Sequence, residues 1–435
     1  MKKSLGFWRT WALVVGTMIG SGVFLLPAVL APYGSYSLGG WIISALGTLF
    51  IALTLGSLAS KIPKIGGPYA YTYAAFGKLP GFLMAWGYWI SCWTGVAALA
   101  VACSGYISVF IPVVNNVPVA SAISSIVIVW IFAAINISGV RTAGIVQLTT
   151  TILKLLPLII IAFAGLAAGN LNNIHATNPN NESIPMLLAG VAMLTMWAYT
   201  GVESATIPAD DVINPSKTIP RTLIIGTLTA TFIYVLSTFG VMALIPQHQL
   251  AESSSPFADA AKTILGGIGG YLIAVGALIS IVGTLNCLIL LSGQMPLAAG
   301  LDHLFPERFI KLNQKDAPGF GLIFSSGLAT ILIVMNYSKG LVSAFTIMIL
   351  LSTLTVLIPY ALSAASEIIL CRKKREKGNS KKIVIAIFAL IFSLFAIIGS
   401  GTEVILYGFI LLASGLPVYY LMLRNRKVIK TINNR

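Results

Sequence analysis

The stretch IGSGVFLLP, residues 19–27, decides the fold, because it interrupts a run that is otherwise typical of a membrane span. The tripeptide Gly20–Ser21–Gly22 lies at its centre, and Pro27 ends it. In hydrocarbon each unpaired backbone group costs several kcal/mol, so a broken helix is tolerated only where it faces protein or a water-filled cavity. The stretch therefore predicts a transmembrane helix that is broken for a functional reason.

Composition places the chain among membrane proteins. Of its 435 residues 57% are hydrophobic and 9% are charged, against about 25% charged residues in a soluble domain. A span needs about 20 mostly apolar residues. We predict an all-α integral membrane protein with twelve transmembrane helices, near 11–31, 39–60, 80–111, 119–139, 146–168, 185–209, 222–245, 268–299, 318–336, 341–369, 383–400 and 403–423.

The net charge of +15 would suggest a nucleic-acid or other acidic partner in a soluble protein. With a cytoplasmic N-terminus, however, the predicted outer loops keep only Lys262 and Lys339, and the other Lys and Arg residues outside the spans fall on the inner side. This positive-inside pattern predicts a multi-pass protein of the inner (plasma) membrane with both termini cytoplasmic and no nucleic-acid partner. The basic cluster at 372–382 is typical of a positively charged loop that fixes the orientation of the protein in the membrane. Binding of anionic lipid by this cluster is an alternative.

A second unusual stretch, MWAYTGVESATIPADD at residues 196–211, places Glu203 inside the sixth span. An acidic residue in a membrane is costly and usually marks an ion or substrate path. Interrupted spans at corresponding positions of two halves indicate an inverted repeat with a binding site between them. We predict one transporter domain over residues 1–435, with a five-plus-five repeat at about 11–168 and 185–369 and two further helices at 383–423.

The chemistry of a broken helix suggests the ligand. Unpaired N–H groups at one end bind an anion, and unpaired carbonyls at the other end bind a cation or ammonium. An α-amino acid carries both charges on one carbon. The glycines of residues 20–22 taken alone would also fit tight packing of small residues against a neighbouring helix.

Several motifs occur in a set order along the chain. They are IGSGVFLLP, GGPYAY (66–71), W-x-x-x-GVES (197–204) and NP-x-K-x-IP-R (214–221). With this set the chain resembles the amino acid–polyamine–organocation transporters, and is most similar to basic amino acid/polyamine antiporters such as the arginine–agmatine exchanger. The resemblance implies a secondary active amino acid transporter, an amino acid/amine antiporter that works by alternating access.

The resemblance also implies roles for single residues. Gly20, Ser21 and Gly22 would take the substrate carboxylate, and Met18 and the Thr200 carbonyl would lie near its ammonium group. The other implied residues are Ser91, Cys92, Leu288 and Ser352 at the substrate, Trp197, Tyr88 and Tyr360 as gates, and Glu203 in an outer or central gate network. Ordinary packing remains an alternative for Trp197 and Tyr88.

Two positions depart from the arginine–agmatine exchanger. Leu288 stands where that exchanger has a tryptophan that stacks on the guanidinium, and Val96 stands where it has an asparagine. Both changes remove groups that favour a guanidinium. Arginine-, ornithine- and agmatine-like substrates remain the expectation, and a smaller or more apolar side chain becomes an alternative.

Lys154, in TTTILKLLPLIII, places a cation in the middle of the fifth span. Proton-coupled and heteromeric-type relatives in the superfamily carry a lysine here, where sodium-coupled relatives hold a sodium ion. Loss of solvation disfavours the charged form of lysine, so Lys154 could be the protonation site of a proton symporter. It could instead be a fixed charge that supports the broken helix, or a side chain that snorkels to the interface. In either of the first two roles the lysine would occupy the place of the sodium ion, so we do not expect transport to be coupled to sodium.

Other function classes fit less well. A membrane serine hydrolase needs a base near its nucleophile, and the three histidines, His175, His248 and His303, fall in predicted loops. A channel would need a symmetric ring of carbonyls or charges, and an amino acid sensor on the same scaffold would be expected to carry a soluble domain. We therefore expect no enzyme activity, metal or cofactor. The expected partners are amino acid or amine substrates and the lipid bilayer, and a homodimer is an open alternative to a monomer.

Overall fold

The structure is a computed structural model, and it describes residues 5–20, 22–62, 67–138, 144–206, 209, 212–373 and 379–423, with side chains for all of these except 144–153. Within these ranges the chain is helical and contains no β-strand apart from two isolated bridges. Over the same ranges nine helices are long and apolar enough to cross a membrane. They are α3 (Tyr36–Lys61), α5 (Lys78–Ile107), α7 (Pro118–Ile137), α10 (Pro215–Leu244), α12 (Pro256–Leu301), α13 (Gly319–Asn336), α14 (Leu341–Lys373), α15 (Asn379–Gly399) and α16 (Thr402–Ala413), the last extended by helical residues to Leu423.

The first and sixth predicted spans are each interrupted, as the sequence predicts. The first consists of α1 (Phe7–Met18) and the short α2 (Leu26–Leu30). The sixth consists of α9 (Ile184–Met196) followed by 3₁₀ turns at Trp197–Tyr199 and Val202–Thr206. Gly20 has φ +142° and Gly201 has φ +97°, conformations that glycine adopts without the steric cost of a side chain. The broken helices are therefore confirmed.

The fifth span is α8 (Gly144–Ala168), and the eighth differs from its predicted bounds. The α12 helix begins at Pro256 and turns at Gly266, where φ is +65°, before its main part runs on to Leu301. The predicted range 268–299 covers only that main part. The helical segment before Gly266 contains Asp259 and Lys262, so it is less apolar and lies outside the hydrophobic run.

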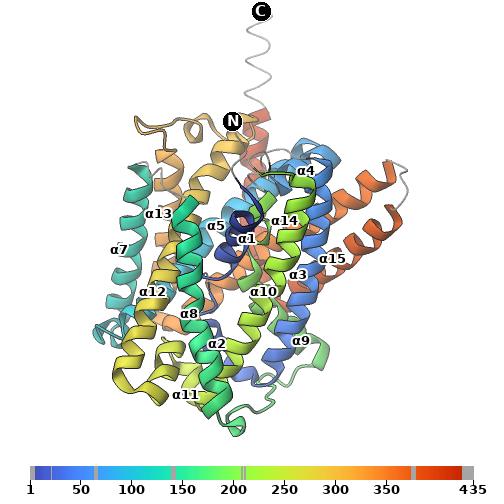
Figure 1. Cartoon of the computed structure of the whole chain (residues 1–435). Helices are drawn as coiled ribbons and strands as arrows, with labels where there is room; N and C mark the ends of the chain where they lie inside the picture. Colours follow the sequence, from blue (N-terminus) through green and yellow to red (C-terminus); the bar gives the residue numbers. More distant parts are fainter. Residues whose placement is uncertain are drawn as a thin grey trace, which may run out of the picture.

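The α5 helix forms the centre of the bundle. It packs against α12 and α14, and a section of its second half, GVAALAVACSG (95–105), is buried. Small residues in this section let the neighbouring helices come close. The broken α1 also lies inside the bundle and contacts α8 and α10 (Figure 1). The interrupted helices are thus surrounded by protein.

The two ends of the bundle carry different short helices. The α2 and α11 (Gln247–Glu252) helices pack together at one end, and α4 (Pro68–Phe76) lies at the other (Figure 1). Leu5 pairs with Val212 just before α10, and the ring of Tyr419 lies 5.2 Å from that of Phe82 near the start of α5. The first and last described residues therefore lie at the α4 end.

Candidate functional site

The two helix breaks lie side by side. Thr17 Oγ1, in the last turn of α1, lies 3.1 Å from the carbonyl oxygen of Gly201 and 3.0 Å from Ser204 Oγ. A Cβ on Gly201 would lie 3.1 Å from the Cβ of Thr17, so a side chain at this position would strain the approach. The unpaired backbone groups of both breaks are therefore brought to one place.

A cavity opens beside the two breaks. Its volume is about 50 Å³, enough for a few water molecules. An amino acid is larger than this, so substrate binding requires one of the lining side chains to move. Eight residues predicted from the sequence line the cavity: Tyr88, Ser91, Cys92, Trp197, Thr200, Glu203, Leu288 and Ser352.

The remaining lining residues were missed by the sequence reasoning. They are Thr17, Gly201, Ser204, Thr284, Cys287, Leu291 and Val356. Helical spacing could have found several of them, because residues three or four apart share a face. Thr284 and Leu291 lie on the same face of α12 as Leu288, and Val356 lies one turn after Ser352 on α14.

Both carboxylate oxygens of Glu203 are bound by tyrosine hydroxyls. Tyr88, from α5, donates to Oε1 at 2.8 Å, and Tyr360, from α14, donates to Oε2. Glu203 is 1% exposed, and a buried charge is tolerated only when it is hydrogen-bonded. The same two helices are joined by Ser352 Oγ, which donates to the carbonyl of Ser91 at 2.7 Å. These contacts close the cavity on the side of α5 and α14.

Trp197 fills the space between two glycines. A Cβ added to Gly22 would overlap the Nε1 and Cδ1 atoms of the indole, and one on Gly95 would lie 3.0 Å from Cη2. The indole is 1% exposed, and its N–H has no acceptor among the described residues. A buried donor without a partner costs about 1–3 kcal/mol. A ligand that enters the cavity and displaces the ring would find this N–H free to donate a hydrogen bond.

Lys154 lies next to the end of α1. Its Nζ is 3.2 Å from the carbonyl oxygen of Gly16 and 3.3 Å from Thr284 Oγ1. The last carbonyls of a helix lack intrahelical partners, and a cation there is favourable. The side chain is 3% exposed, a position that does not fit snorkelling to the membrane interface.

Some predicted residues lie beside the cavity rather than on its wall. Tyr360 binds the lining residue Glu203, and Gly20 adjoins Lys154, because a Cβ on Gly20 would lie 3.2 Å from the ammonium nitrogen. Met18 and Gly22 are buried behind the lining. Ser21 lies outside the described residues. Across the described residues there is no group of three His, Cys, Asp or Glu side chains that could hold a metal ion.

Comparison with known proteins identifies the family of the chain. Residues 5–421 match the amino acid permease family. The chain belongs to that family. This permease is 32% identical to the arginine/ornithine antiporter of Pseudomonas aeruginosa over 93% of its length and 88% of the relative's. It is 30% identical to the putative arginine/ornithine antiporter of Bacillus subtilis over 96% of both chains, and 30% identical to the cadaverine/lysine antiporter of Escherichia coli K12 over 92% of its length and 90% of the relative's.

Proposed function

We propose that this permease is a secondary active antiporter that exchanges an amino acid for another amino acid or an amine by alternating access. The observation that carries the proposal is the contact between the two helix breaks at Thr17 and Gly201, beside a cavity inside the membrane-spanning bundle. Paired broken helices offer an anion-binding and a cation-binding pole close together. The relatives named as antiporters support exchange as the mode of transport.

The proposed arrangement is a single transporter domain with twelve spans, an inverted five-plus-five repeat and both termini in the cytoplasm. Leu5 and Tyr419 lie at the same end of the bundle, as an even number of spans requires. The α4 end would then face the cytoplasm, and the end with α2 and α11 would face outward. The inside excess of Lys and Arg supports insertion in the inner membrane in this orientation.

In this proposal the backbone at residues 20–22 binds the substrate carboxylate, and the carbonyl of Thr200 binds the ammonium group. Thr200 has extended backbone angles, φ −62° and ψ 138°, so its carbonyl leaves the helical hydrogen-bond pattern. Trp197 covers the substrate from one side. The resemblance implies an outer or central gate for Glu203; in this proposal Glu203, held by Tyr88 and Tyr360, instead closes the site on the cytoplasmic side.

The substrate side chain would lie against Leu288, Leu291 and Val356, the aliphatic residues of the cavity lining. This aliphatic wall suits the alkyl stem of an amino acid or amine. Among the lining residues Glu203 carries the one carboxylate, which gives the cavity a negative charge and suits a substrate with a net positive charge. Arginine, ornithine, lysine and the corresponding amines are therefore the first substrates to test.

A proton-coupled symporter is the second candidate function, because Lys154 places a titratable group against the end of α1. Its two hydrogen-bond contacts among the described residues are to a carbonyl and a hydroxyl, both of which accept hydrogen bonds from a charged ammonium. This geometry favours a lysine that stays charged and supports α1, and hence antiport over symport.

Reconstitution in liposomes tests the two candidates. Vesicles are loaded with one unlabelled amino acid or amine, and the uptake of labelled arginine, lysine, ornithine or neutral amino acids is followed with and without an imposed proton gradient. Uptake that requires an internal substrate and ignores the gradient is expected. Uptake into empty vesicles that follows the gradient would replace antiport with proton symport.

A further inference from the structure

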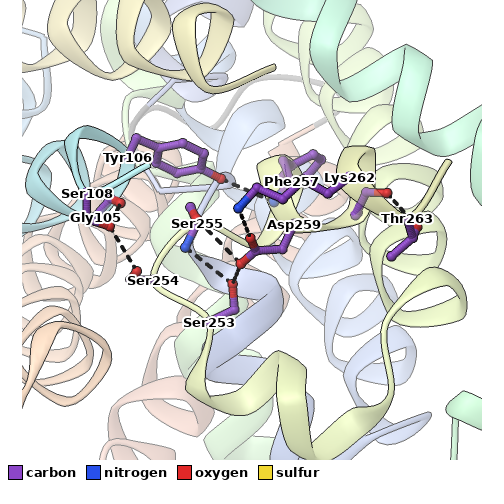
Figure 2. A network of polar contacts seen from close by, with 11 residues as sticks. Gly105, Tyr106, Ser108, Ser253, Ser254, Ser255, Phe257, Asp259, Lys262 and Thr263 are labelled. Atoms are coloured by element: carbon purple, nitrogen blue, oxygen red, sulfur yellow. Dashed lines mark hydrogen bonds and ion pairs between the residues drawn. The ribbon is translucent and has the colours of Figure 1, made fainter. Parts of the chain in front are cut away.

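Tyr106, near the end of α5, lies outside the central cavity and joins two segments at the α2 end of the bundle. Its hydroxyl donates to the carbonyl of Phe24 at 2.7 Å. The same hydroxyl accepts the backbone N–H of Phe257 at 3.4 Å (Figure 2). Phe24 belongs to the stretch between the helix break and α2, and Phe257 lies in the first turn of α12. Tyr106 is fully buried. One hydroxyl thus connects α5, the second half of the broken helix and the start of α12.

The aromatic rings around this hydroxyl reinforce the connection. The ring of Phe24 lies 6.0 Å from that of Tyr106 and 5.3 Å from that of Phe257, both in edge-to-face geometry. Gly105 brings the backbones into contact, because a Cβ there would overlap the carbonyl oxygen of Ser254. The contact is therefore a packed unit that permits little separation without losing the hydrogen bond.

The segment that carries Phe257 is itself braced. Ser253 Oγ donates to Asp259 Oδ2 at 2.6 Å and accepts the backbone N–H of Ser255 at 3.3 Å, and Lys262 Nζ lies 2.9 Å from Asp259 Oδ1 (Figure 2). An acidic side chain in the first turn of a helix also stabilises the helix start. The brace fixes the position of the Phe257 N–H relative to Tyr106.

Tyr106 and Tyr88 lie on the same face of α5. They are 18 residues apart, which is about five turns at 3.6 residues per turn and roughly 27 Å along the helix axis. Tyr88 binds Glu203 in the second broken helix, and Tyr106 binds Phe24 in the first. A single buried helix therefore holds one part of each broken helix with a tyrosine hydroxyl, on opposite sides of the cavity.

We infer that Tyr106 is a positioning residue for transport, which holds the second half of the broken first helix closed over the outer side of the cavity. The inference rests on the proposed function, since alternating access requires each side to open in turn. Tyr88 and Glu203 would then hold the cytoplasmic side, and Tyr106 with Phe24 and Phe257 would hold the outer side. Opening outward requires Phe24 to leave Tyr106.

The native thiols of the cavity report this opening. Cys92 and Cys287 line the cavity, so a membrane-impermeant, charged methanethiosulfonate reagent reaches them only from a side that is open. The experiment uses the full chain with Cys103 and Cys371 replaced by serine, in vesicles of known orientation, and measures the labelling rate from the outer and the cytoplasmic side.

Tyr106→Phe keeps the ring packing and removes the hydroxyl. We expect labelling of Cys92 and Cys287 from the outer side to rise about two- to tenfold, the range that corresponds to loss of one hydrogen bond, while labelling from the cytoplasmic side falls or stays constant. The KM for substrate added outside should fall relative to the KM for substrate added inside. Ser253→Ala, which only loosens the brace, should give a smaller shift in the same direction.

Ser393→Ala is the control. Ser393 is also fully buried, and its hydroxyl donates to the carbonyl of Ala389 at 2.8 Å within α15, which carries neither a helix break nor a residue of the cavity lining. It should change stability by a similar amount and leave the sidedness of labelling unchanged. Equal outer labelling in Tyr106→Phe and in the parent chain would overturn the inference. If the parent chain exchanges none of the candidate substrates but the labelling still shifts, the proposed function fails and the role of Tyr106 in closing the outer side stands.

Discussion

The ammonium nitrogen of Lys154 lies 3.2 Å from the carbonyl oxygen of Gly16, so a cation of α8 binds the end of α1 just before the helix break. Gly20 adjoins the same ammonium group, because a Cβ on Gly20 would lie 3.2 Å from its nitrogen. A hydrogen bond with a charged partner contributes about 1.5–3 kcal/mol. Lys154 thus connects the fifth span to the predicted carboxylate-binding backbone without touching the cavity itself.

Replacing Lys154 separates the two roles considered for it. Lys154→Met should lower the exchange rate at least tenfold while the protein still folds, because the Gly16 carbonyl loses its partner. Lys154→Arg should retain a substantial part of the activity if a permanent charge is what α1 needs, since arginine remains charged at any accessible pH. The measurement is counterflow in proteoliposomes. An inactive arginine variant, together with gradient-driven uptake by the parent chain, would assign Lys154 to proton coupling.

Gly22 is expected to tolerate no side chain, because a Cβ there would overlap the indole of Trp197. Gly22→Ala should displace the ring and raise the KM for substrate at least tenfold, and Gly22→Trp should abolish transport with normal expression. Substrate-dependent quenching of tryptophan fluorescence and labelled uptake measure the effect. Gly327→Ala is the control, since a Cβ at Gly327 meets no atom within 4 Å. Normal uptake by Gly22→Trp would contradict a central site at the break.

The sequence predicted the membrane fold because hydropathy alone places apolar helices in lipid. It predicted the two breaks because glycines within a span and Glu203 have no simple role in an unbroken helix. The resemblance to known transporters then identified eight of the residues that line the cavity. These features depend on local composition or on shared motifs, which a single sequence contains.

Contacts between distant segments could not be predicted in this way. Lys61 and Glu367 are 306 residues apart and form an ion pair at 2.8 Å, and nothing in either neighbourhood indicates the other. The same holds for Thr17 and Gly201. Which faces of two helices meet is decided by packing across the whole bundle, and that information is spread over many residues.

The Lys61–Glu367 pair provides a prediction on stability. Glu367 is 1% exposed and accepts hydrogen bonds from Lys61 and from Ser57 at 2.6 Å, so Glu367→Ala would leave a cation without its partner. Because Lys61 is about one-fifth exposed, we expect a loss of about 2–3 kcal/mol, at or below the lower end of the range for buried pairs. Thermal unfolding in detergent measures it.

A matched acidic residue controls for the change in net charge. Glu252 lies 3.7 Å from His248, and the two side chains are 75% and 88% exposed. Glu252→Ala should change stability by less than about 0.5 kcal/mol, because exposed pairs contribute little. Equal melting temperatures for the two variants would show that the Lys61–Glu367 contact does not stabilise the bundle.

Leu288 is the position at which we expect substrate selectivity to change most. It lines the cavity on α12, and a Cβ on Gly95 would lie 2.9 Å from its Cδ1, so its side chain bounds the space available to the substrate. Leu288→Ala enlarges this space by about three methyl-sized groups, which should favour substrates with a longer or bulkier end. We expect the ratio of kcat/KM for arginine to that for ornithine to rise about tenfold, since a few methylene-sized contacts are worth about 1–3 kcal/mol of discrimination.

The prediction follows from the position of Leu288 in the cavity lining on α12, a helix that carries neither of the two breaks. If the carboxylate and ammonium groups are held by residues 20–22 and Thr200, the α-carbon is fixed and the side chain can only extend toward α12. A change at Leu288 must then alter selectivity between side chains while leaving the requirement for both α-substituents unchanged. Leu291→Ala, one turn away on the same wall, should act in the same direction and more weakly if the side chain extends along this wall. If both variants instead lose all substrates equally, the side chain does not lie against α12, and the substrate is held in the opposite orientation, with its α-carbon next to the aliphatic wall and its side chain toward Glu203.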